Sequence, residues 1–428
     1  MIYFPAIYNR QATLMNLPDI RVNAQRLHST LDAINAFGRN PVTGGCNRAS
    51  YSPADMDARA WLAGVMKADG LRVRIDAVGN VIGRYGPADG PCVMTGSHLD
   101  TVPEGGAWDG ALGVAAALES VRAMIDIGHV PHQAIEVVAT AEEEGRFGGM
   151  LGAQAIAGVV DSTWFDNAQD ASGRKLRDAL REAGLAPERI ADAARAPHEV
   201  SAWLELHIEQ GPVLERTGVP IGIVEAISGV ASVRIALQGR ANHAGTTPMD
   251  MRADALVGAA RVIAAIDTLI ERNGTPNSRV TAGSLTLTPN FAHTIAGRAE
   301  FTVIVRDTEA QVMDQLCDGL QALVSATAAA HVLQPTTKVT SRLDPVALDG
   351  DLVALARAQA DAAGMQACVM ASGAGHDAQV LQSICPAVML FVPSRGGLSH
   401  APGESTSWAH AEMGATLLAR LLVQAAQR

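Results

Sequence analysis

The chain has 428 residues, of which 48% are hydrophobic and 18% are charged, and its formal net charge is −11. That length accommodates two or three domains of about 100–200 residues each, and a composition this apolar excludes an intrinsically disordered chain. The negative charge, together with the absence of any lysine or arginine cluster, argues against a nucleic-acid partner.

The N-terminal segment, residues 1–16, lacks the basic start and the long apolar run of a secretory signal peptide. The longest notable uncharged stretch, residues 319–337, carries Gln, Ser, Thr and His among many alanines, which predicts a packed helix and not a membrane span. The five cysteines form no CxxC pair, and their odd number leaves one unpaired in any disulfide scheme. These features predict a soluble protein of the cytoplasm, where thiols stay reduced, with no membrane partner.

The first half of the chain alternates predicted strands with predicted helices. Residues 54–69 have apolar side chains at helical spacing, and residues 71–85 alternate polar and apolar side chains as a strand or hairpin does. Short apolar runs, each typical of a strand buried on both faces, lie at 92–94, 134–139 and 386–392, and a helix is predicted at 110–125. Strands that alternate with helices predict an α/β fold with a mostly parallel sheet.

Each of the three apolar runs is followed by a cluster of ionisable residues. The clusters are contained in TGSHLD, TAEEEG and PSRGGLSHAPGE. A fourth predicted strand, WLELHIEQG, places Glu205, His207 and Glu209 on one face. Because ligands bind outside the carboxyl ends of the strands in open α/β sheets, we expect the four clusters to converge.

The character of the chain changes near Gly222. Before it, residues 161–200 form a charged helical stretch that predicts a surface insertion. After it, the segments ASVRIALQG, SRVTAGSLTLTP and GRAEFTVIVRD predict antiparallel strands, with helices near 252–270 and 308–330. Because the last buried strand comes only later, we predict an α+β domain at 222–342 inserted into a catalytic domain that is built from 1–221 and 343–428.

The converging clusters contain the residue types of a metal centre. The candidate residues are His98, Asp109, Glu143, Glu144, His207 and His400. Imidazole and carboxylate are the ligands that zinc, manganese, cobalt and nickel prefer, and five such ligands suit two ions that share a carboxylate. One of the adjacent glutamates would be a ligand and the other the general base. Asp100 is placed to hydrogen-bond the second ring nitrogen of His98.

Taken singly, each of these residues has an ordinary structural interpretation. A lone histidine at a strand end is more often a hydrogen-bonded surface or core residue, and three consecutive glutamates usually form a solvated turn. Convergence is what favours the metal site. Other chemistries lack their usual motifs, since the chain contains no GxSxG, no GxxxxGK[ST], no HExxH and no GxGxxG after a strand.

Several longer segments resemble the hydantoinase/carbamoylase family of amidases, within the superfamily of dinuclear zinc metallopeptidases. They are TGSHLDTVPEGGAWDGALGV, EEEGRFGGMLGAQAIAG, ELHIEQGPVLE, GRANHAGTTPMDMRADAL, SGAGHDAQ and GGLSHAPGE. The family includes N-carbamoyl-L-amino acid hydrolase, β-ureidopropionase and allantoate amidohydrolase. The resemblance implies an α/β catalytic domain with an inserted lid that forms a homodimer.

The resemblance also implies roles for the site residues, with two divalent ions in each subunit (zinc, or manganese, cobalt or nickel). His98 and His207 would hold one ion, Glu144 and His400 the other, and Asp109 would bridge them. Glu143 would be the general base. His243, in the inserted domain, would stabilise the oxyanion from across the dimer interface.

For the substrate, the resemblance implies that Gln210 contacts the ureido or amide group and that Arg306 clamps a carboxylate. Gly375 and His376, in GAGHD, would line the pocket. The family's asparagine thirteen residues before that arginine is replaced here by His293, although Asn290 lies nearby. Arg306 could instead be a salt-bridge partner, and His376 a structural residue, so the identity of the substrate stays open.

We therefore predict a metal-dependent amidohydrolase that cleaves the linear C–N bond of a small N-carbamoyl or ureido acid. Allantoate is an alternative substrate within the family. An aminopeptidase or dipeptidase of the same superfamily is an alternative with different chemistry. A non-catalytic relative with a decayed metal site is a third, and the complete set of ligands argues against it.

Overall fold

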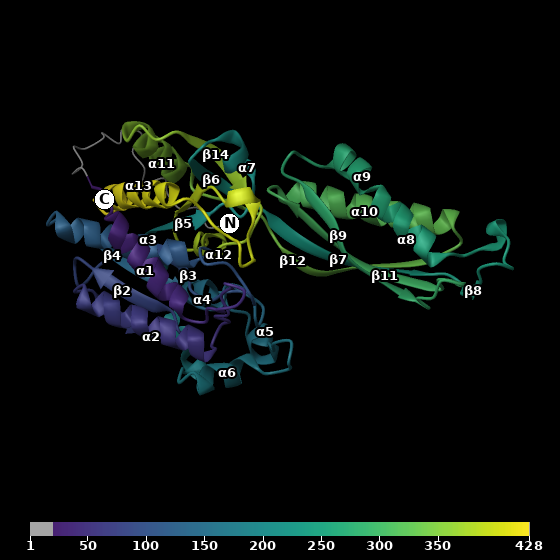
Figure 1. Ribbon diagram of the computed structural model, residues 1–428, viewed down its shortest axis with the longest axis horizontal. Coiled ribbons are helices and arrows are strands. Elements are labelled where there is room, and N and C mark those ends of the chain that lie inside the picture. The colour runs from purple at the N-terminus through teal and green to yellow at the C-terminus, as the bar shows by residue number, and fades with distance from the viewer. Residues whose placement is uncertain (1–19, 428) are drawn as a thin grey trace. The chain divides into compact units, whose positions relative to one another are not determined.

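The structure is a computed structural model that describes residues 20–427, and these divide into two compact units (Figure 1). Unit 1 comprises the described residues up to Glu225, with Leu348–Met370 and the residues from His376 onward. Unit 2 comprises Ala226–Ala347 and Ala371–Gly375. The inserted domain was predicted at 222–342, and the short segment at 371–375 was not predicted as part of it.

Unit 1 contains most of a nine-stranded sheet, whose order is β1-β2-β4-β3-β5-β15-β6-β13 with β14 beside β6. The strands are β1 (Arg72–Ile75), β2 (Val81–Tyr85), β3 (Cys92–His98), β4 (Ala134–Thr140), β5 (Val200–Ile208), β6 (Ile221–Ile227), β13 (Val346–Ala347), β14 (Ala367–Ser372) and β15 (Ala387–Val392). The chain boundary between the units leaves β13 and the last residues of β6 and β14 in unit 2.

The four middle strands, β4, β3, β5 and β15, are parallel to one another. Every residue of β3, β4 and β15 is buried, which explains why these strands appear in the sequence as continuous apolar runs. The strands beside them pair antiparallel. The prediction of a mainly parallel α/β sheet is confirmed, and the carboxyl ends of the four middle strands lie along one edge.

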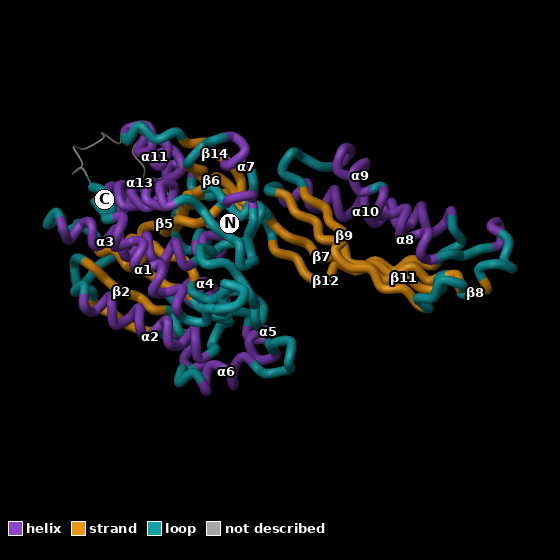
Figure 2. The backbone as a smooth tube through the Cα atoms, viewed as in Figure 1, coloured by secondary structure: helices purple, strands orange, loops and turns teal. Residues whose placement is uncertain are grey.

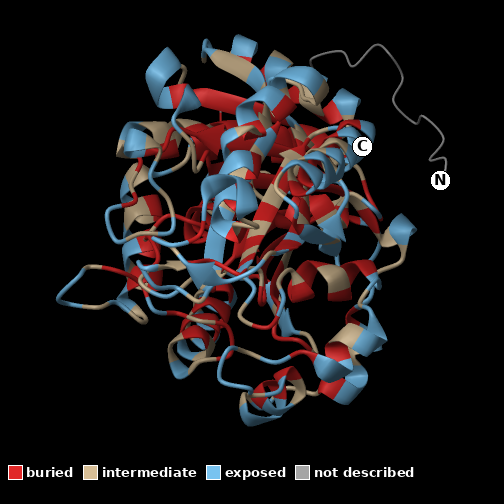
Figure 3. Cartoon of the chain, turned by 90° about the vertical axis from the view of Figure 1, so that its right-hand side faces the viewer, coloured by how far each residue is buried: buried red, intermediate tan, exposed pale blue. Residues whose placement is uncertain are grey.

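Helices cover this sheet, and α3 is buried along nearly its whole length because it packs on β3 and between α1 and α13. The helices of unit 1 are α1 (Ala24–Ala36), α2 (Pro53–Ala68), α3 (Ala111–Asp126), α4 (Leu151–Ala157), α5 (Ser162–Asn167), α6 (Leu176–Glu182), α7 (Val213–Thr217), α11 (Gly350–Ala362), α12 (Asp377–Leu381) and α13 (Trp408–Ala425). Short 3-10 helices lie at Pro187–Ala193, Pro197–Glu199 and Arg395–Gly397. The alternation of buried and exposed residues along the helices can be followed in Figure 3.

The charged stretch at 161–200 is only partly a surface insertion. Phe165, Leu176 and Leu180 from α5 and α6 are buried, and they pack with Phe147 and Leu151 in a small separate core. Phe147 and Leu151 of this core follow the triple glutamate of residues 142–144 in the sequence. The stretch therefore supports the segment that follows β4.

Unit 2 has one four-stranded antiparallel sheet, of order β12-β7-β11-β9, with helices packed against it (Figure 2). Its elements are β7 (Gly229–Gln238), β8 (Asn242–His243), α8 (Ala255–Ala264), α9 (Ile266–Asn273), β9 (Arg279–Thr288), β10 (Thr294–Ile295), β11 (Arg298–Asp307), α10 (Ala310–Ala330) and β12 (Gln334–Leu343), with a 3-10 helix at Met249–Met251. Along β11 every second residue is buried, as a sheet with one covered face requires.

One predicted helix boundary is wrong. Residues 319–337 were predicted as a single helix, but α10 ends at Ala330 and residues 334–337 already belong to the edge strand β12. Nearly all of β12 is exposed, so it lacks the apolar alternation that marks a strand in a sequence. Among residues 20–427, no helix combines the length and the hydropathy that crossing a membrane needs.

Candidate metal centre

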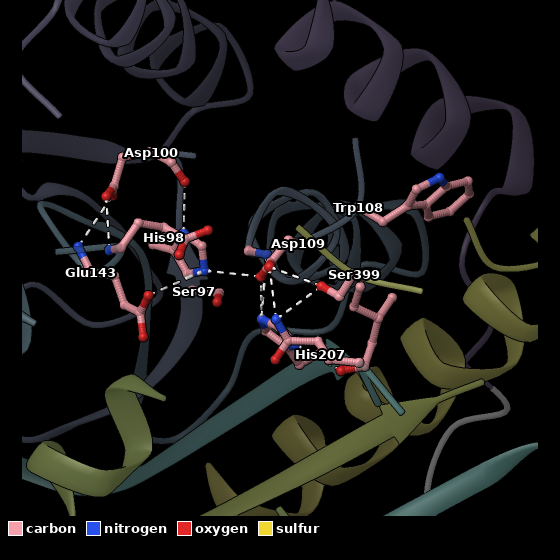
Figure 4. Close-up of polar contacts among 12 residues, drawn as sticks. Ser97, His98, Asp100, Trp108, Asp109, Glu143, His207 and Ser399 are labelled. Carbon is pink, nitrogen blue, oxygen red and sulfur yellow. Dashed lines mark hydrogen bonds and ion pairs between the residues drawn. The ribbon is translucent and has the colours of Figure 1, made fainter. Parts of the chain in front are cut away.

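The carboxylate of Asp109, in the loop between β3 and α3, lies at the middle of the cluster in Figure 4. Its Oδ1 is 3.0 Å from His207 Nε2 and 3.3 Å from His98 Nε2, and its Oδ2 is 3.2 Å from His400 Nε2. Two groups of potential ligands therefore share Asp109. We call His98, Asp109 and His207 the first ligand group, and Asp109, Glu144 and His400 the second ligand group.

The ligands come from the four parallel strands in the middle of the sheet. His98 is the last residue of β3, and His207 lies next to the end of β5. Glu144 follows β4, and His400 lies in the loop after β15. Because parallel strands end at one edge, side chains that are far apart in the sequence meet there, as we predicted from the four clusters.

Backbone carbonyl groups orient the two buried imidazoles. His98 Nδ1 lies 2.9 Å from the carbonyl oxygen of Asp100, and His207 Nδ1 lies 2.8 Å from that of Ile208. A carbonyl oxygen only accepts, so each Nδ1 carries a proton. Once the ring gives up the proton that Nε2 shares with Asp109, Nε2 presents a lone pair, which is the tautomer that a metal ligand needs.

His400 is held differently from the other two imidazoles. Its side chain is 50% exposed, whereas those of His98 and His207 are 4% and 1% exposed. Its backbone has a φ of +55°, which is uncommon for a residue with a Cβ. Its Nε2 lies 3.4 Å from Oε2 of Glu144. The second ligand group is therefore the more open of the two.

Glu143 belongs to neither ligand group, and its Oε2 lies 3.7 Å from His98 Nε2. Asp100 was predicted to hydrogen-bond His98, and it does so through its backbone carbonyl. Its carboxylate instead accepts hydrogen bonds from the backbone N–H groups of Glu143, at 3.3 Å, and Glu144, at 3.0 Å. Since the carbonyl already reaches the ring, the carboxylate is left to orient the turn that carries the candidate base.

Sequence reasoning assigned no role to Glu142, the first of the three glutamates. It is fully buried, and its carboxylate accepts hydrogen bonds from the backbone N–H groups of Phe147, at 2.6 Å, and Gly149, at 3.0 Å. These bonds fold residues 142–149 into a loop. The triple glutamate is therefore not a solvated turn. Glu142 bonds backbone N–H groups, Glu143 lies near His98, and Glu144 lies near His400.

Arg59 of α2 was also missed. Its guanidinium is 1% exposed and donates to the carbonyl oxygens of Ala139 and Thr140 at the end of β4. The same guanidinium lies 3.8 Å from a carboxylate oxygen of Asp100. A buried arginine thus fixes the strand end from which the turn with Glu143 and Glu144 departs. Only the position of Arg59 in a helical pattern was visible in the sequence.

Burial and close charges shift the pKa values of this cluster. Burial alone would raise the pKa of Asp109, but hydrogen bonds from His207, His400 and His98 outweigh it and hold that pKa well below its ordinary value. Burial raises the pKa of Glu143 well above its ordinary value, and it raises that of Glu144 to about 7. A carboxyl group with a raised pKa is suited to accept and return a proton near neutral pH.

Gln210 and His376 lie beside the ligand groups. Gln210 Nε2 donates to Asp109 Oδ2, at 2.8 Å, and to Ser399 Oγ, at 3.1 Å. Its Oε1 is buried and has no hydrogen-bond partner among the described residues. The ring of His376 lies 4.6 Å from the ring of His207, and burial holds its pKa well below the ordinary value, so it is neutral.

In unit 2, Arg306 and His243 each form hydrogen bonds with backbone groups. Arg306 Nη1 donates to the carbonyl oxygen of Gly373, in the segment that ends at Gly375. His243 is exposed, and its Nδ1 accepts hydrogen bonds from the backbone N–H groups of Gly245, at 2.9 Å, and Thr246, at 3.2 Å. The neutral imidazole of His243 therefore carries its proton on the exposed Nε2.

His293 and Asn290 lie at the end of unit 2 that carries His243. Both are exposed, and the carbonyl oxygen of His293 accepts a hydrogen bond from the backbone N–H of Ala244. Strand β11, which pairs along its whole length with β7, separates this end from Arg306. At ~3.3 Å per residue that separation is about 26 Å or more, so His293 and Arg306 of one unit 2 do not meet on one small substrate.

Known proteins resemble this chain in both sequence and fold. Residues 94–424 match the peptidase family M20/M25/M40, which is most of the chain.

The chain belongs to this family.

Among M20/M25/M40 members, the chain is 38% identical to an N-carbamoyl-L-amino acid amidohydrolase of Geobacillus stearothermophilus, over 95% of this chain and 99% of the relative. It is 37% identical to an allantoate amidohydrolase of Bacillus subtilis, over 90% of this chain and 93% of the relative. A crystal structure of a hydantoinase/carbamoylase family amidase from Burkholderia multivorans is 34% identical and superimposes with a TM-score of 0.90, covering 96% of this chain and 100% of the other. The resemblance noted in the sequence is confirmed.

The residues of this M20/M25/M40 member fit a pair of divalent cations. Each ligand group offers three nitrogen or oxygen atoms within 4.8 Å of one another. The carboxylates of Asp109, Glu143 and Glu144 are crowded into a buried site, where uncompensated negative charge is costly. Cations held by the imidazoles and carboxylates would neutralise that charge, and the donor set is one that zinc and related metals accept.

Proposed function

We propose that the chain is an amidohydrolase with two divalent metal ions, which cleaves the linear C–N bond of a small N-carbamoyl or ureido acid. The observation that carries the proposal is the position of Asp109, whose two carboxylate oxygens face two separate ligand groups. A shared carboxylate between two sets of imidazole and carboxylate ligands is the arrangement that two adjacent ions need. Zinc is the metal we test first, and manganese, cobalt and nickel suit the same donors.

Bound cations would polarise the substrate carbonyl and make water a better nucleophile near neutral pH. Glu143, which belongs to neither ligand group, takes a proton from the attacking water at its Oε2 and delivers it to the leaving nitrogen. Asp100 holds the backbone of Glu143, so the base stays on the side of His98. For an N-carbamoyl amino acid, the chain would convert the substrate and one water into the free amino acid, carbon dioxide and ammonia.

Gln210 is suited to recognise the ureido group. Its Nε2 is fixed by Asp109 and Ser399, and its buried Oε1 has no partner among the described residues, so it would accept a hydrogen bond from the substrate NH₂. Arg306 would bind the substrate carboxylate, for which a guanidinium has the matching geometry. Gly375 and neutral His376 would line the pocket.

We further propose a homodimer in which His243 of one chain acts at the metal centre of the other. The proton on the exposed Nε2 of His243 is suited to stabilise an oxyanion. The separation of His243 and His293 from Arg306 along β11 supports this arrangement, since one copy of unit 2 cannot bring both ends to one small molecule. In this dimer His293, or Asn290 beside it, would contact the substrate carboxylate from the partner's side.

The experiment is ammonia release from a panel of N-carbamoyl-L-amino acids, allantoate and dipeptides, with metal-free protein and with protein loaded with zinc, manganese, cobalt or nickel. We expect turnover of N-carbamoyl amino acids only with metal. Preference for allantoate would select the alternative ureido substrate, and dipeptide cleavage without ammonia release would select a peptidase. Metal-loaded protein that turns over no ureido compound would overturn the proposal.

A further inference from the structure

One buried carboxylate, Glu404, connects the loops that carry the two ligand groups. It is 4% exposed, and it is not itself part of either ligand group. Its Oε1 accepts hydrogen bonds from the backbone N–H groups of Trp108 and Asp109, both at 3.0 Å. Its Oε2 accepts from the backbone N–H of His400, at 3.2 Å, and from Ser399 Oγ, at 2.8 Å. Two loops that follow different strands therefore meet on one side chain.

The two loops do not depend on Glu404 equally. Asp109 is also held by the start of α3, where the backbone N–H of Ala111 donates to its carbonyl oxygen and that of Leu112 donates to Trp108. His400 has no such helix beside it, because it lies in a loop with a half-exposed side chain and a φ of +55°. Loss of Glu404 would therefore free His400 much more than Asp109.

The chain makes room for this carboxylate at Gly106. A Cβ at that position would lie 2.0 Å from Oε1 of Glu404, which is far inside contact distance. Gly106 does not have a left-handed φ, so close approach by Glu404 is the reason that a side chain is excluded there. The fit between Gly106 and Glu404 indicates that the position of the carboxylate matters, as well as its charge.

Ser399 connects Glu404 to Gln210, the residue proposed to contact the ureido group. Its hydroxyl donates to Glu404 Oε2 and its oxygen accepts from Gln210 Nε2. The hydroxyl can donate only one proton, and its distance to Glu404 is 2.8 Å against 3.4 Å to Asp109, so Glu404 decides its orientation.

We infer that Glu404 is a positioning residue that sets the metal affinity of the second ligand group. It holds His400 where its Nε2 meets Glu144 and Asp109, and it touches neither substrate nor ion. The inference rests on the two-ion centre proposed above. Hydrogen-bonded partners of ligands typically change metal affinity by about 10- to 100-fold, and here the change falls on one of two positions.

The test is a zinc titration of the metal-stripped, full-length chain, in competition with a chromophoric chelator. Wild-type protein should bind two equivalents. Glu404→Gln keeps the shape of the side chain but replaces one acceptor oxygen by an NH₂ group, which cannot accept a hydrogen bond. Its first equivalent should bind within about threefold of wild type and its second about 10- to 100-fold more weakly. Gly106→Ala keeps the charge but displaces the carboxylate, and it should show the same split. Glu412→Gln, on the half-exposed surface of α13, is the matched control and should bind like wild type.

Ser399→Ala removes one hydrogen bond to Oε2 and gives a milder version of the same split, so the test still decides if Glu404→Gln does not fold. Melting of each metal-free variant, followed by circular dichroism, separates loss of folding from loss of binding. Second equivalents that bind Glu404→Gln and Ser399→Ala as tightly as wild type would overturn the inference. Equal weakening of both equivalents would also overturn it, because Glu404 would then support the whole centre. Wild-type protein that binds a single equivalent would overturn the two-ion function and this inference with it.

Discussion

The residues with chemical roles in unit 1 and in unit 2 differ in how firmly they are held. In unit 1, His98, Asp109 and His207 are buried and each bonds a fixed backbone or side-chain group. In unit 2, the exposed side chain of His243 accepts hydrogen bonds from its own turn, and the half-buried Arg306 donates to the carbonyl oxygen of Gly373. Metal ligands must be preorganised before the ion arrives, whereas residues that meet a substrate need only be within reach of it.

The two sheets explain this difference. The parallel strands of unit 1 are covered on both faces, so polar side chains that face the site lie at the strand ends, enclosed by the loops that follow. The antiparallel sheet of unit 2 has helices on one face, and the outer positions of β9 and β12 are largely exposed. Substitution of a residue of the two ligand groups in unit 1 should therefore change metal content, whereas substitutions in unit 2 should change kinetics alone.

The largest effect is expected for Glu143→Gln, which tests the most enclosed part of unit 1. Glutamine keeps the side-chain shape and the backbone bond to Asp100 but cannot take up a proton. Turnover should fall by about 10²- to 10⁴-fold, with metal content unchanged. Ammonia release and elemental analysis on one preparation measure both. Activity near that of wild type would mean that another group is the base.

His243→Ala tests the exposed end of unit 2. Loss of an oxyanion donor should lower turnover by about 10²- to 10³-fold. Metal content and unfolding temperature should not change, because the side chain is exposed and accepts hydrogen bonds from the N–H groups of Gly245 and Thr246 in its own turn. Kinetics, elemental analysis and thermal melting check the three expectations. A loss of metal in this variant would instead make His243 a ligand and would break the distinction between the units.

Arg306→Ala should act on substrate binding. Removing the charged hydrogen bonds to a carboxylate should raise KM by about 10- to 100-fold, with a smaller effect on kcat. Lysine should not restore KM, because it lacks the planar fork of the guanidinium. Arg279→Ala is the matched control, since Arg279 lies opposite Arg306 on β9 and donates to Pro276 and Ser278 carbonyl groups. Equal KM values in the two alanine variants would remove Arg306 from the binding site.

The last expected effect is a pH dependence of zinc binding. In the metal-free chain, burial raises the pKa of Glu144 to about 7, and the hydrogen bond to Asp109 raises that of His400 to about 9. Both groups hold protons below these values, and zinc must displace them. Affinity of the second ligand group should therefore rise about tenfold per pH unit between 7 and 9 and level off above. Chelator competition across this pH range measures the zinc affinity. The His243→Ala variant is the control and should show the same pH dependence. A flat profile would contradict the assignment of Glu144 and His400 as zinc ligands.

Much of the fold could be predicted because buried strands and amphipathic helices leave strong patterns. Strands β4 and β15 and helix α3 match their predicted segments closely, whereas β3 extends four residues beyond the predicted run and β5 begins three residues before its predicted segment. Strand β12 could not be predicted, because QPTTKVTSRL lies exposed at a sheet edge and has no buried face to produce alternation. The segment at 371–375 joins unit 2 through tertiary contacts alone, which no local pattern records.

The convergence of the candidate ligands could be predicted, because metal ligation restricts them to a few residue types and these lie at the ends of parallel strands. Glu404, Glu142 and Arg59 could not, since their carboxylate or guanidinium groups mainly bond backbone atoms, and a backbone N–H or carbonyl is present at every position. The location of His293 also escaped prediction. Its spacing from Arg306 along the chain was clear, but only the pairing of β11 shows that this spacing runs the length of a sheet.

Asp100 contacts the site through two different groups, its backbone carbonyl, which a substitution retains, and its carboxylate, which a substitution can remove. Its carbonyl fixes the proton on His98, and its carboxylate fixes the turn of the base. Every amino acid possesses that carbonyl, so the tautomer of His98 is encoded in the path of the main chain and survives any replacement that preserves the path. Substitution at position 100 should therefore disturb the turn at residues 143 and 144 and leave the proton on His98 Nδ1 in place.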